Sequence, residues 1–339
     1  MEALGRRIRY TGMEAIRTAT GFRVAAAYPD DAGMIRLAGR LAERIFGEAG
    51  SADSWGERGS ARLRDDPDAQ LLVGFFEGEG VGFLFGHGGG DGVFVVQSVG
   101  VLGDYRRAGV GSLLIRRQEE LAAGRGFGRI RLAVGNESKA MMRLSLLFGM
   151  GVVGVVRDER SEVLKVLFEK RVGAPMLRRP GRRDFSFQVE GWPIKRACEV
   201  EGIYQAAFGE ELDEGHPTLD EMLLVDSAYS EVLHVALVDG RPVGFKHAQE
   251  RTRGLLHSHI GAVHPAFRGG GVAGALMKAQ HAWAASEGYG GITTRSRNRY
   301  PQMLRLNLRH GFDIVGAVDS RGELALHLYK RLKWDEECG

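Results

Sequence analysis

Twelve residues between an apolar stretch and an amphipathic stretch have the composition of an anion-binding turn. They run from Val263 to Gly274 and read Val-His-Pro-Ala-Phe-Arg-Gly-Gly-Gly-Val-Ala-Gly. Small residues at the start of a helix let a ligand approach the backbone, and the unpaired N–H groups of the first turn favour phosphate. Arg268 adds a positive charge beside them. We call residues 263–274 the second cradle, because a similar run at 101–111, the first cradle, lies upstream.

The glycines of the second cradle also fit the Gly-x-Gly-x-x-Gly fingerprint of dinucleotide-binding folds. That fingerprint requires an acidic residue about 20 residues later, at the end of the next strand, to hold a ribose hydroxyl. The next predicted strand ends instead in Thr293-Thr294-Arg295, and the first cradle is followed by Leu114 in place of the third glycine. The pattern therefore argues against a nicotinamide or flavin site.

Both cradles belong to a longer internal repeat. The offsets between Arg106 and Arg268 and between Asn136 and Asn298 are both 162 residues, and the same register extends back to Phe46-Gly47 and Phe208-Gly209. A constant offset over this length indicates duplication of a domain. The sequence therefore predicts two tandem domains, at 22–171 and 184–332, with an N-terminal extension at 1–21, a linker rich in proline and arginine at 172–183, and a tail at 333–339.

The first repeat illustrates the order of elements that both repeats predict. Apolar runs indicate strands at 22–29, 71–76, 81–85 and 93–101, and a capped amphipathic run indicates a helix at 32–46 that Gly47 ends. Residues 50–68 have a loop-like composition with room for one short helix. After the cradle we expect a helix at 109–123, a strand at 129–134, a helix at 138–148, and strands at 151–156 and 162–170.

The spacing Arg-x-x-Gly-x-Ala at 268–273, and Arg-x-x-Gly-x-Gly at 106–111, resembles the coenzyme A pyrophosphate loop of the GNAT superfamily of N-acyltransferases. The later helices, which end in Gly149-Met150 and Gly311-Phe312, follow in the order that this family has. The resemblance implies an α/β (α+β) fold with two GNAT-like domains. Each would be a mixed, mostly antiparallel sheet, flanked by helices and splayed between its fourth and fifth strands, with acetyl-CoA or another acyl-CoA in the splay.

The resemblance also implies which residues bind the cofactor. In the second domain they are Val263, Arg268, Gly269, Gly270, Gly271, Val272, Ala273, Asn298 and Asn307, and in the first Val101, Arg106, Arg107, Gly109, Val110, Gly111 and Asn136. For Asn298, capping of the later helix is an alternative to cofactor contact.

Acyl transfer to an amine requires orientation, polarisation of the carbonyl and removal of a proton. Side chains alternate along a strand, which places His257, His259, Gly261 and Val263 on one face of the strand before the second cradle. The first repeat has no titratable group at these positions. We therefore expect the second domain to be catalytic, with His259 or His257 as general base, directly or through a water molecule. A hydrogen-bonded structural role for either histidine stays open.

Many GNAT enzymes carry a tyrosine as general acid four residues before the Gly-Phe of the later helix. Asn307 occupies that position here, so Tyr300 is the candidate substitute acid and Asn307 a candidate contact of the pantetheine arm. The acceptor is expected near an acidic run that contains Glu211, Asp213 and Glu214, which would attract a cationic amine. A solvated acidic loop explains the same run.

Composition narrows the classes of protein that fit. The chain has 339 residues, a net charge of +3 and 44% hydrophobic residues, which is typical of a globular protein and gives no reason to expect nucleic acid as a partner. No apolar run approaches the length of a membrane span, so we expect a cytoplasmic protein. The two cysteines fit no metal site, and Cys198 is expected in the core.

The sequence thus favours transfer of an acetyl group from acetyl-CoA to a primary amine of a small molecule or peptide by direct attack, in a monomer or homodimer. Transfer of a longer acyl chain to a peptide or natural-product amine is one alternative. A non-catalytic regulatory module that binds acyl-CoA is another, favoured by the missing tyrosine.

Overall fold

The computed structural model describes residues 16–17, 21–158, 163–178, 181–209, 219, 223, 230–320 and 322–332. By its contacts the chain divides into two compact units. The first comprises Met1–Val134 and Leu167–Pro175, and the second comprises Gly135–Val166 and Met176–Gly339. The candidate acceptor residues Glu211, Asp213 and Glu214 lie outside the described residues.

The first sheet is mixed and contains the strand that leads into the first cradle. Its strand order is β1-β2-β3-β4-β5-β6-β8-β7. Strands β1 to β5 pair antiparallel, and β5 pairs parallel with β6. The strands are β1 (Ile16–Arg17), β2 (Arg23–Ala27), β3 (Gln70–Phe76), β4 (Glu79–Gly88), β5 (Val93–Val101), β6 (Arg129–Gly135), β7 (Gly151–Arg157) and β8 (Leu164–Arg171).

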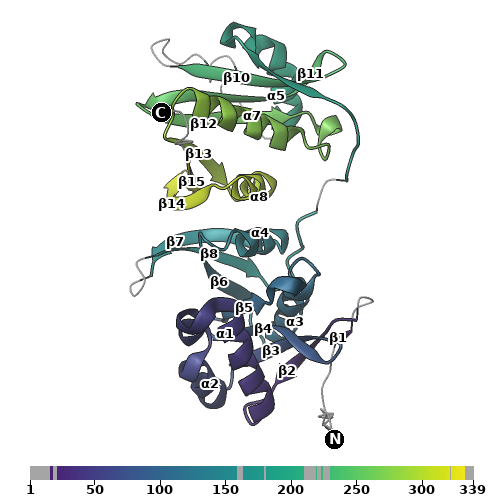
Figure 1. Ribbon diagram of the computed structural model, residues 1–339, viewed down its shortest axis with the longest axis vertical. Helices are drawn as coiled ribbons and strands as arrows, with labels where there is room; N and C mark the ends of the chain where they lie inside the picture. The colour runs from purple at the N-terminus through teal and green to yellow at the C-terminus, as the bar shows by residue number, and fades with distance from the viewer. Residues whose placement is uncertain are drawn as a thin grey trace, which may run out of the picture. The chain divides into compact units, whose positions relative to one another are not determined.

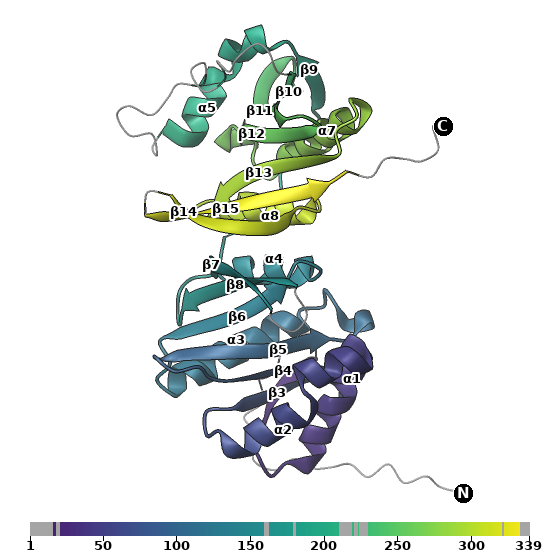
Figure 2. The same cartoon turned by 90° about the vertical axis from the view of Figure 1, so that its left-hand side faces the viewer.

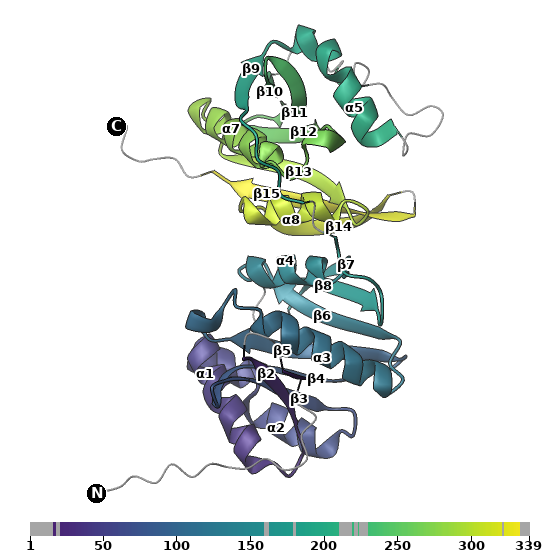
Figure 3. The same ribbon diagram turned by 90° about the vertical axis from the view of Figure 1, so that its right-hand side faces the viewer.

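Helices cover both faces of the sheet in the first unit. Helices α1 (Ala32–Ser54) and α2 (Gly56–Asp65) pack on one face (Figure 2), where Trp55 contacts Phe85 with ring centroids 4.9 Å apart. Helix α3 (Val110–Gly124) follows the first cradle and covers the other face (Figure 3). Gly47 interrupts α1 with a φ of 75°, as the sequence predicts. The short helix allowed for in 50–68 is confirmed as α2, but the expected loop around it is wrong, because α1 continues to Ser54 and Trp55 anchors the helical residues in the core.

The second unit repeats this arrangement around a sheet with the strand order β14-β15-β13-β12-β11-β10-β9. Helix α7 lies along one face of β10 to β12 (Figure 1), and α5 covers the other. The described elements are α4 (Lys139–Leu147), β9 (Gln188–Trp192), α5 (Glu201–Phe208), β10 (Glu231–Val238), β11 (Arg241–Thr252), β12 (Leu255–Val263), α7 (Val272–Ser286), β13 (Gly291–Arg297), α8 (Pro301–Arg309), β14 (Asp313–Ser320) and β15 (Glu323–Arg331).

The structure also tests the expectation for Cys198. Cys198 is exposed in a 3₁₀ segment at Ile194–Val200, so the expectation that it lies in the core is wrong. Its short helical turn presents Ala197 and Val200 to the core instead. Within the described part of the chain, every helix is too short or too polar to cross a membrane.

Each sheet splays beside its cradle. Strands β5 and β6 pair only from Val93 to Val96, and β12 and β13 pair only from Leu255 to Ser258, although β5 and β12 each continue for five more residues. The parallel strands therefore separate on the way to the cradle. This confirms the mixed, splayed sheets that the resemblance implies.

A β-bulge sits where each splay begins. In the second unit His247 pairs with Ile260 and Ala248 with Ser258, so His259 is an extra residue in β12. The bulge in the first unit falls 162 residues earlier, between Phe85 and Gly86. An extra residue interrupts alternation and bends the strand, which makes the shared face expected for residues 257–263 wrong. His257 and His259 lie together, but Ala262 packs on the α5 side and Val263 on the α7 side.

The two units differ in the chemistry of their interiors. His234, Lys246 and His281 are buried in the second unit, and burial lowers their pKa to about 4, about 8 and about 3. The first unit has Leu72 and Leu84 at the positions equivalent to His234 and Lys246. Nine of the ten histidines follow residue 200, since only His87 precedes it. The second interior therefore holds histidines that stay neutral near pH 7 and a lysine whose charged form is disfavoured by burial.

We predict that acid unfolds the second unit before the first. Burial also holds the pKa of His247 at about 3 and of His257 at about 4, whereas an unfolded histidine titrates near 6.5. Between these values the unfolded chain binds more protons than the folded one, so stability falls as the pH drops from about 6.5 to about 4. Calorimetric scans across this pH range should show two unfolding transitions. The midpoint temperature of one should fall much further than that of the other.

His234→Leu, which introduces the residue of the first unit, should reduce that pH dependence and raise the midpoint at pH 5. Equal acid sensitivity of both transitions, or no effect of His234→Leu, would contradict the prediction.

Candidate functional site

The second cradle is open at Gly271, where α7 begins. Gly271 is the N-cap of α7 with a φ of 88°, and Gly269 has a φ of 89°, a left-handed conformation that side chains other than glycine rarely adopt. A Cβ atom added at Gly271 would meet nothing within 4 Å. Arg268 donates from Nε to the carbonyl of Val263 at 3.2 Å, which anchors its guanidinium at the end of β12. The open turn, free first-turn amides and fixed cation suit a phosphate.

The first cradle has almost the same geometry. Gly109 is the N-cap of α3 with a φ of 97°, and a Cβ atom there would also meet nothing within 4 Å. Arg106 donates from Nε to the carbonyl of Val101 at 3.1 Å. Arg107 holds a positive φ of 67° where the second cradle has Gly269. The cradle residues that the sequence predicts are thus brought together in both units.

A segment of the linker packs on the second cradle. The backbone N–H of Arg183 donates to the carbonyl of Gly269 at 3.5 Å, and its guanidinium donates to the carbonyl of Ala266. The ring of Phe185 meets that of Phe267 edge to face, with centroids 5.5 Å apart. A Cβ atom at Gly270 would lie 2.3 Å from the Phe185 ring, so this contact requires glycine. We call residues 181–187 the brace.

Three histidines meet on the α5 side of the splay. The ring centroid of His259 lies 5.9 Å from that of His247 and 6.0 Å from that of His257. His247 is fully buried, His257 is nearly so, and His259 is partly exposed at the bulge. Among the described residues, no group of three or more His, Cys, Asp or Glu side chains could hold a metal ion. The cluster therefore offers proton acceptors rather than a metal centre.

The electrostatic surroundings keep these histidines neutral. Burial is the main cause that lowers the pKa of His247 to about 3 and of His257 to about 4, and it also lowers the pKa of His259. The positive charge of Arg251 lowers all three further. Near pH 7 each ring can thus accept a proton.

Hydrogen bonds orient two of the rings. The Nδ1 atom of His257 lies 3.0 Å from the hydroxyl of Thr293, which in turn donates to the carbonyl of Leu256 at 3.4 Å. Because that hydroxyl donates elsewhere, it accepts from Nδ1–H, and this tautomer leaves Nε2 as the basic atom. The Nε2 atom of His247 lies 3.4 Å from a carboxylate oxygen of Glu231. The buried Nδ1 atoms of His247 and His259 have no partner in the described structure.

Backbone groups outside the cradles bind both asparagines. Asn298 donates to the carbonyl of Val152 at 2.7 Å and accepts from its N–H at 2.9 Å, within the second unit. Asn136 makes the same two bonds with Ile314, both at 2.9 Å. Helix α8 has Tyr300 at its N-cap, so the capping alternative for Asn298 is wrong. With both ends of each amide engaged, a cofactor role for either asparagine stays a prediction.

The remaining candidates lie on or beside α8. Asn307 is buried in that helix, and only 2% of its surface is exposed. Tyr300 is partly exposed and meets Phe208 of α5 edge to face, with ring centroids 6.2 Å apart. Tyr300 therefore lies toward the α5 side, where the histidines also lie.

Four residues beside the site did not emerge from the sequence: Arg183 and Phe185 of the brace, His247, and Arg251. The brace lies where the predicted linker meets the second domain, and its proline and arginine content suggested only a spacer. The signal that was available is the run Gly269-Gly270-Gly271, which has one more glycine than its backbone angles require. His247 was hidden in an apolar hairpin strand whose first-unit equivalent is Phe85.

Comparison with known families and structures gives a consistent result. A family model described as "Acetyltransferase (GNAT) family" matches residues 40–150, and one described as "Acetyltransferase (GNAT) domain" matches residues 229–332. No curated protein matches the chain.

Three solved structures that the chain resembles each align with less than half of it. The ribosomal-protein-S18-alanine N-acetyltransferase from Escherichia coli is 15% identical, with a TM-score of 0.37, over 44% of this chain and 95% of that one. An N-acetyltransferase from Staphylococcus aureus Mu50 is 17% identical, with a TM-score of 0.39, over 44% and 100%. A Bacillus anthracis putative streptothricin acetyltransferase, solved in complex with acetyl coenzyme A, is 17% identical, with a TM-score of 0.30, over 32% and 64%.

We predict that the brace keeps the second cradle ordered. Fixing the backbone of one residue costs about 1–2 kcal/mol of conformational entropy, and the brace holds a run of three glycines. Phe185→Ala should therefore speed amide hydrogen exchange at residues 269–273 by about tenfold. The first cradle, at residues 107–111, serves as the internal control and should not change. Unaltered protection of the second cradle in Phe185→Ala would refute this role.

Proposed function

Since the chain belongs to the GNAT superfamily of acetyltransferases, with one domain in each half, we propose that it transfers an acetyl group from acetyl-CoA to a primary amine. We propose further that the domain in the second half is the catalytic one. The observation that carries this assignment is the cluster of His247, His257 and His259 at the bulge of β12. The equivalent residues of the first half are Phe85, Val95 and Gln97, none of which can accept a proton near pH 7.

The second cradle fits the pyrophosphate of acetyl-CoA. Its open glycine turn at Gly271, the first-turn amides of α7 and the anchored guanidinium of Arg268 would hold the two phosphates. When bound, acetyl-CoA supplies the reactive thioester. The bulge at His259 takes one residue out of the β12 ladder, which leaves backbone N–H capacity there for the thioester oxygen.

The histidines would manage the proton of the acceptor. The acceptor nitrogen forms a C–N bond with the carbonyl carbon, the C–S bond breaks, and the proton lost from nitrogen passes to His259 or His257, directly or through a water molecule. The coenzyme A thiolate that leaves must in turn receive a proton, and Tyr300 is the candidate donor of that proton. A base with a lowered pKa is weak, so it acts best once attack has made the nitrogen acidic.

Two other functions remain to be separated from this one. Transfer of a longer acyl chain uses the same residues and differs only in the acyl group accepted. A regulatory module that binds acyl-CoA without turnover would not need the three neutral histidines, and their burial therefore favours catalysis.

Replacing the histidines by the residues of the first half tests the assignment. We expect His259→Gln and His257→Val together to lower amine-dependent release of coenzyme A thiol by about 10²- to 10⁴-fold, because general-base catalysis contributes that much. Binding of acetyl-CoA, measured by calorimetry, should stay within about twofold. His87→Gln in the first unit is the matched control. Full activity of the double variant would exclude these histidines as bases.

The pH dependence of kcat/KM is a separate prediction. An unperturbed histidine base would give a falling limb near pH 6.5, but burial lowers the pKa of His257 to about 4. Initial rates should therefore show no inflection at 6.5 and should rise with pH as the acceptor amine loses its proton. An acid limb centred near 6.5, removed by His259→Gln, would show that the histidines titrate normally in the working enzyme.

A further inference from the structure

Two arginines lie beside the candidate bases on the α5 side of the second unit. Arg295 is the first residue of β13 beyond its last pair with β12, Ser258 with Thr294, so it stands where the splay begins. Across the sheet it pairs with His327 of β15. Arg251 is the extra residue of a second bulge, because Glu250 pairs with Leu256 and Thr252 with Leu255. Both arginines are exposed.

The charges of the two arginines converge on the histidines. Arg251 and Arg295 both lower the pKa of His257, and Arg295 lowers the pKa of Arg251 itself. Arg251 also acts on His247 and His259. Both arginines therefore lie close enough to His257 for their charges to act on it.

Neither arginine makes an ion pair within the part of the chain that the structure describes. Neighbouring arginines do: Arg297 and Arg299 bind Glu323 with N–O distances of 3.0 Å and 2.7 Å. Arg251 and Arg295 thus differ from Arg297 and Arg299, which lie on β13 and in the turn after it and are paired with a carboxylate.

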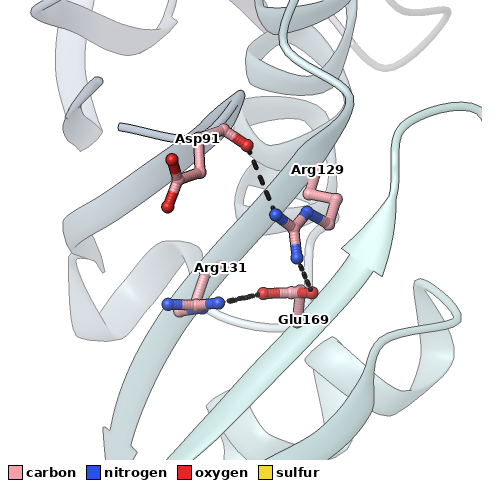
Figure 4. Close-up of polar contacts among 4 residues, drawn as sticks. All are labelled: Asp91, Arg129, Arg131 and Glu169. Carbon is pink, nitrogen blue, oxygen red and sulfur yellow. Dashed lines mark hydrogen bonds and ion pairs between the residues drawn. The ribbon is translucent and has the colours of Figure 1, made fainter. Parts of the chain in front are cut away.

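The first unit has matched arginines on β6, the strand equivalent to β13. There Arg131 donates from Nε to Glu169 at 2.8 Å, and Arg129 lies 3.4 Å from the other carboxylate oxygen and donates to the carbonyl of Asp91 at 3.3 Å (Figure 4). Arg131 is equivalent to Thr293, which in the second unit holds His257. The first half has Gly89 and Ala133 at the positions equivalent to Arg251 and Arg295, so these two cations belong to the second half alone.

Resting on the proposed acetyl transfer by this site, we propose that the amine acceptor also carries a carboxylate, which Arg251 and Arg295 bind. A guanidinium is planar and presents paired N–H donors that match the two oxygens of a carboxylate. The acceptor class is therefore an amino acid, or a peptide or small molecule with a carboxylate near its amine. A purely cationic amine would be repelled by the same two charges.

Binding of the carboxylate would also prepare the base. The positive charges of Arg251 and Arg295 disfavour the protonated form of His257, so an anion placed against them removes part of that effect. Proton acceptance by His257 becomes easier once the correct acceptor is bound. The arginines therefore serve both recognition and catalysis.

The test compares matched pairs of acceptors. The standard α-amino acids and their carboxamides are offered with acetyl-CoA, and release of coenzyme A thiol is followed. For the amino acids that the wild-type protein acetylates, kcat/KM should be at least about tenfold higher for the acid than for its carboxamide. Arg251→Gln with Arg295→Gln should reduce that preference to less than about twofold, mainly by raising the KM of the acid. Arg253→Gln, in the exposed turn after β11, should keep it.

Equal or better use of the amides by the wild-type protein would overturn the proposal, as would an unchanged preference in the double variant. Calorimetric binding of the same pairs in the presence of coenzyme A separates this proposal from the proposed function. Selective binding of acids without turnover would support the carboxylate site and count against acetyl transfer. Turnover of amides and acids alike would support acetyl transfer and reject the carboxylate site.

Discussion

The β-bulge at His259 is the feature on which the rest of the second unit depends. One extra residue in β12 turns His257 and His259 toward the α5 side and sends Val263 to the α7 side, where it leads into the cradle. The same bulge lies where β12 and β13 stop pairing, so the opening between them begins next to the histidines. A single change of register thus places the anion-binding turn and the proton acceptors around one opening.

The two halves share this backbone plan and differ in what they place on it. The bulges, the cradle angles and the arginine anchors recur at an offset of 162 residues. The first half has Phe85, Val95 and Gln97 at the histidine positions, and its buried Gln118, equivalent to Gln280, donates to Gln70 at 2.6 Å. The second half buries histidines and a lysine whose pKa falls to about 8, and leaves both polar atoms of Gln280 without a partner in the described structure. Such an interior costs stability, which is typical of a site kept for chemistry.

Much of this plan could be predicted from the sequence, because it depends on local patterns and on the repeat. Most strands and helices lie within a few residues of their expected bounds, and both cradles were found from glycine spacing. The bulge could not be predicted, because the run Leu-Leu-His-Ser-His-Ile-Gly-Ala-Val of β12 has no regular alternation of apolar and polar residues that an extra residue would interrupt. The brace was missed for a related reason: a linker of prolines and arginines gives no sign of what it packs against. Arg251 and Arg295 acquire meaning only when the sheet brings three strands together. The acidic run at 211–214 lies outside the described residues, so its role stays a prediction.

The central claim is that catalysis belongs to the second half although both halves keep an open cradle. The most direct test is amine-dependent release of coenzyme A thiol in two matched variants, Gly109→Glu and Gly271→Glu, each of which puts a side chain and a negative charge into one cradle at a positive φ. We predict that Gly271→Glu abolishes thiol release, while Gly109→Glu retains at least about half of it. Loss of activity in Gly109→Glu with normal activity in Gly271→Glu would contradict the account.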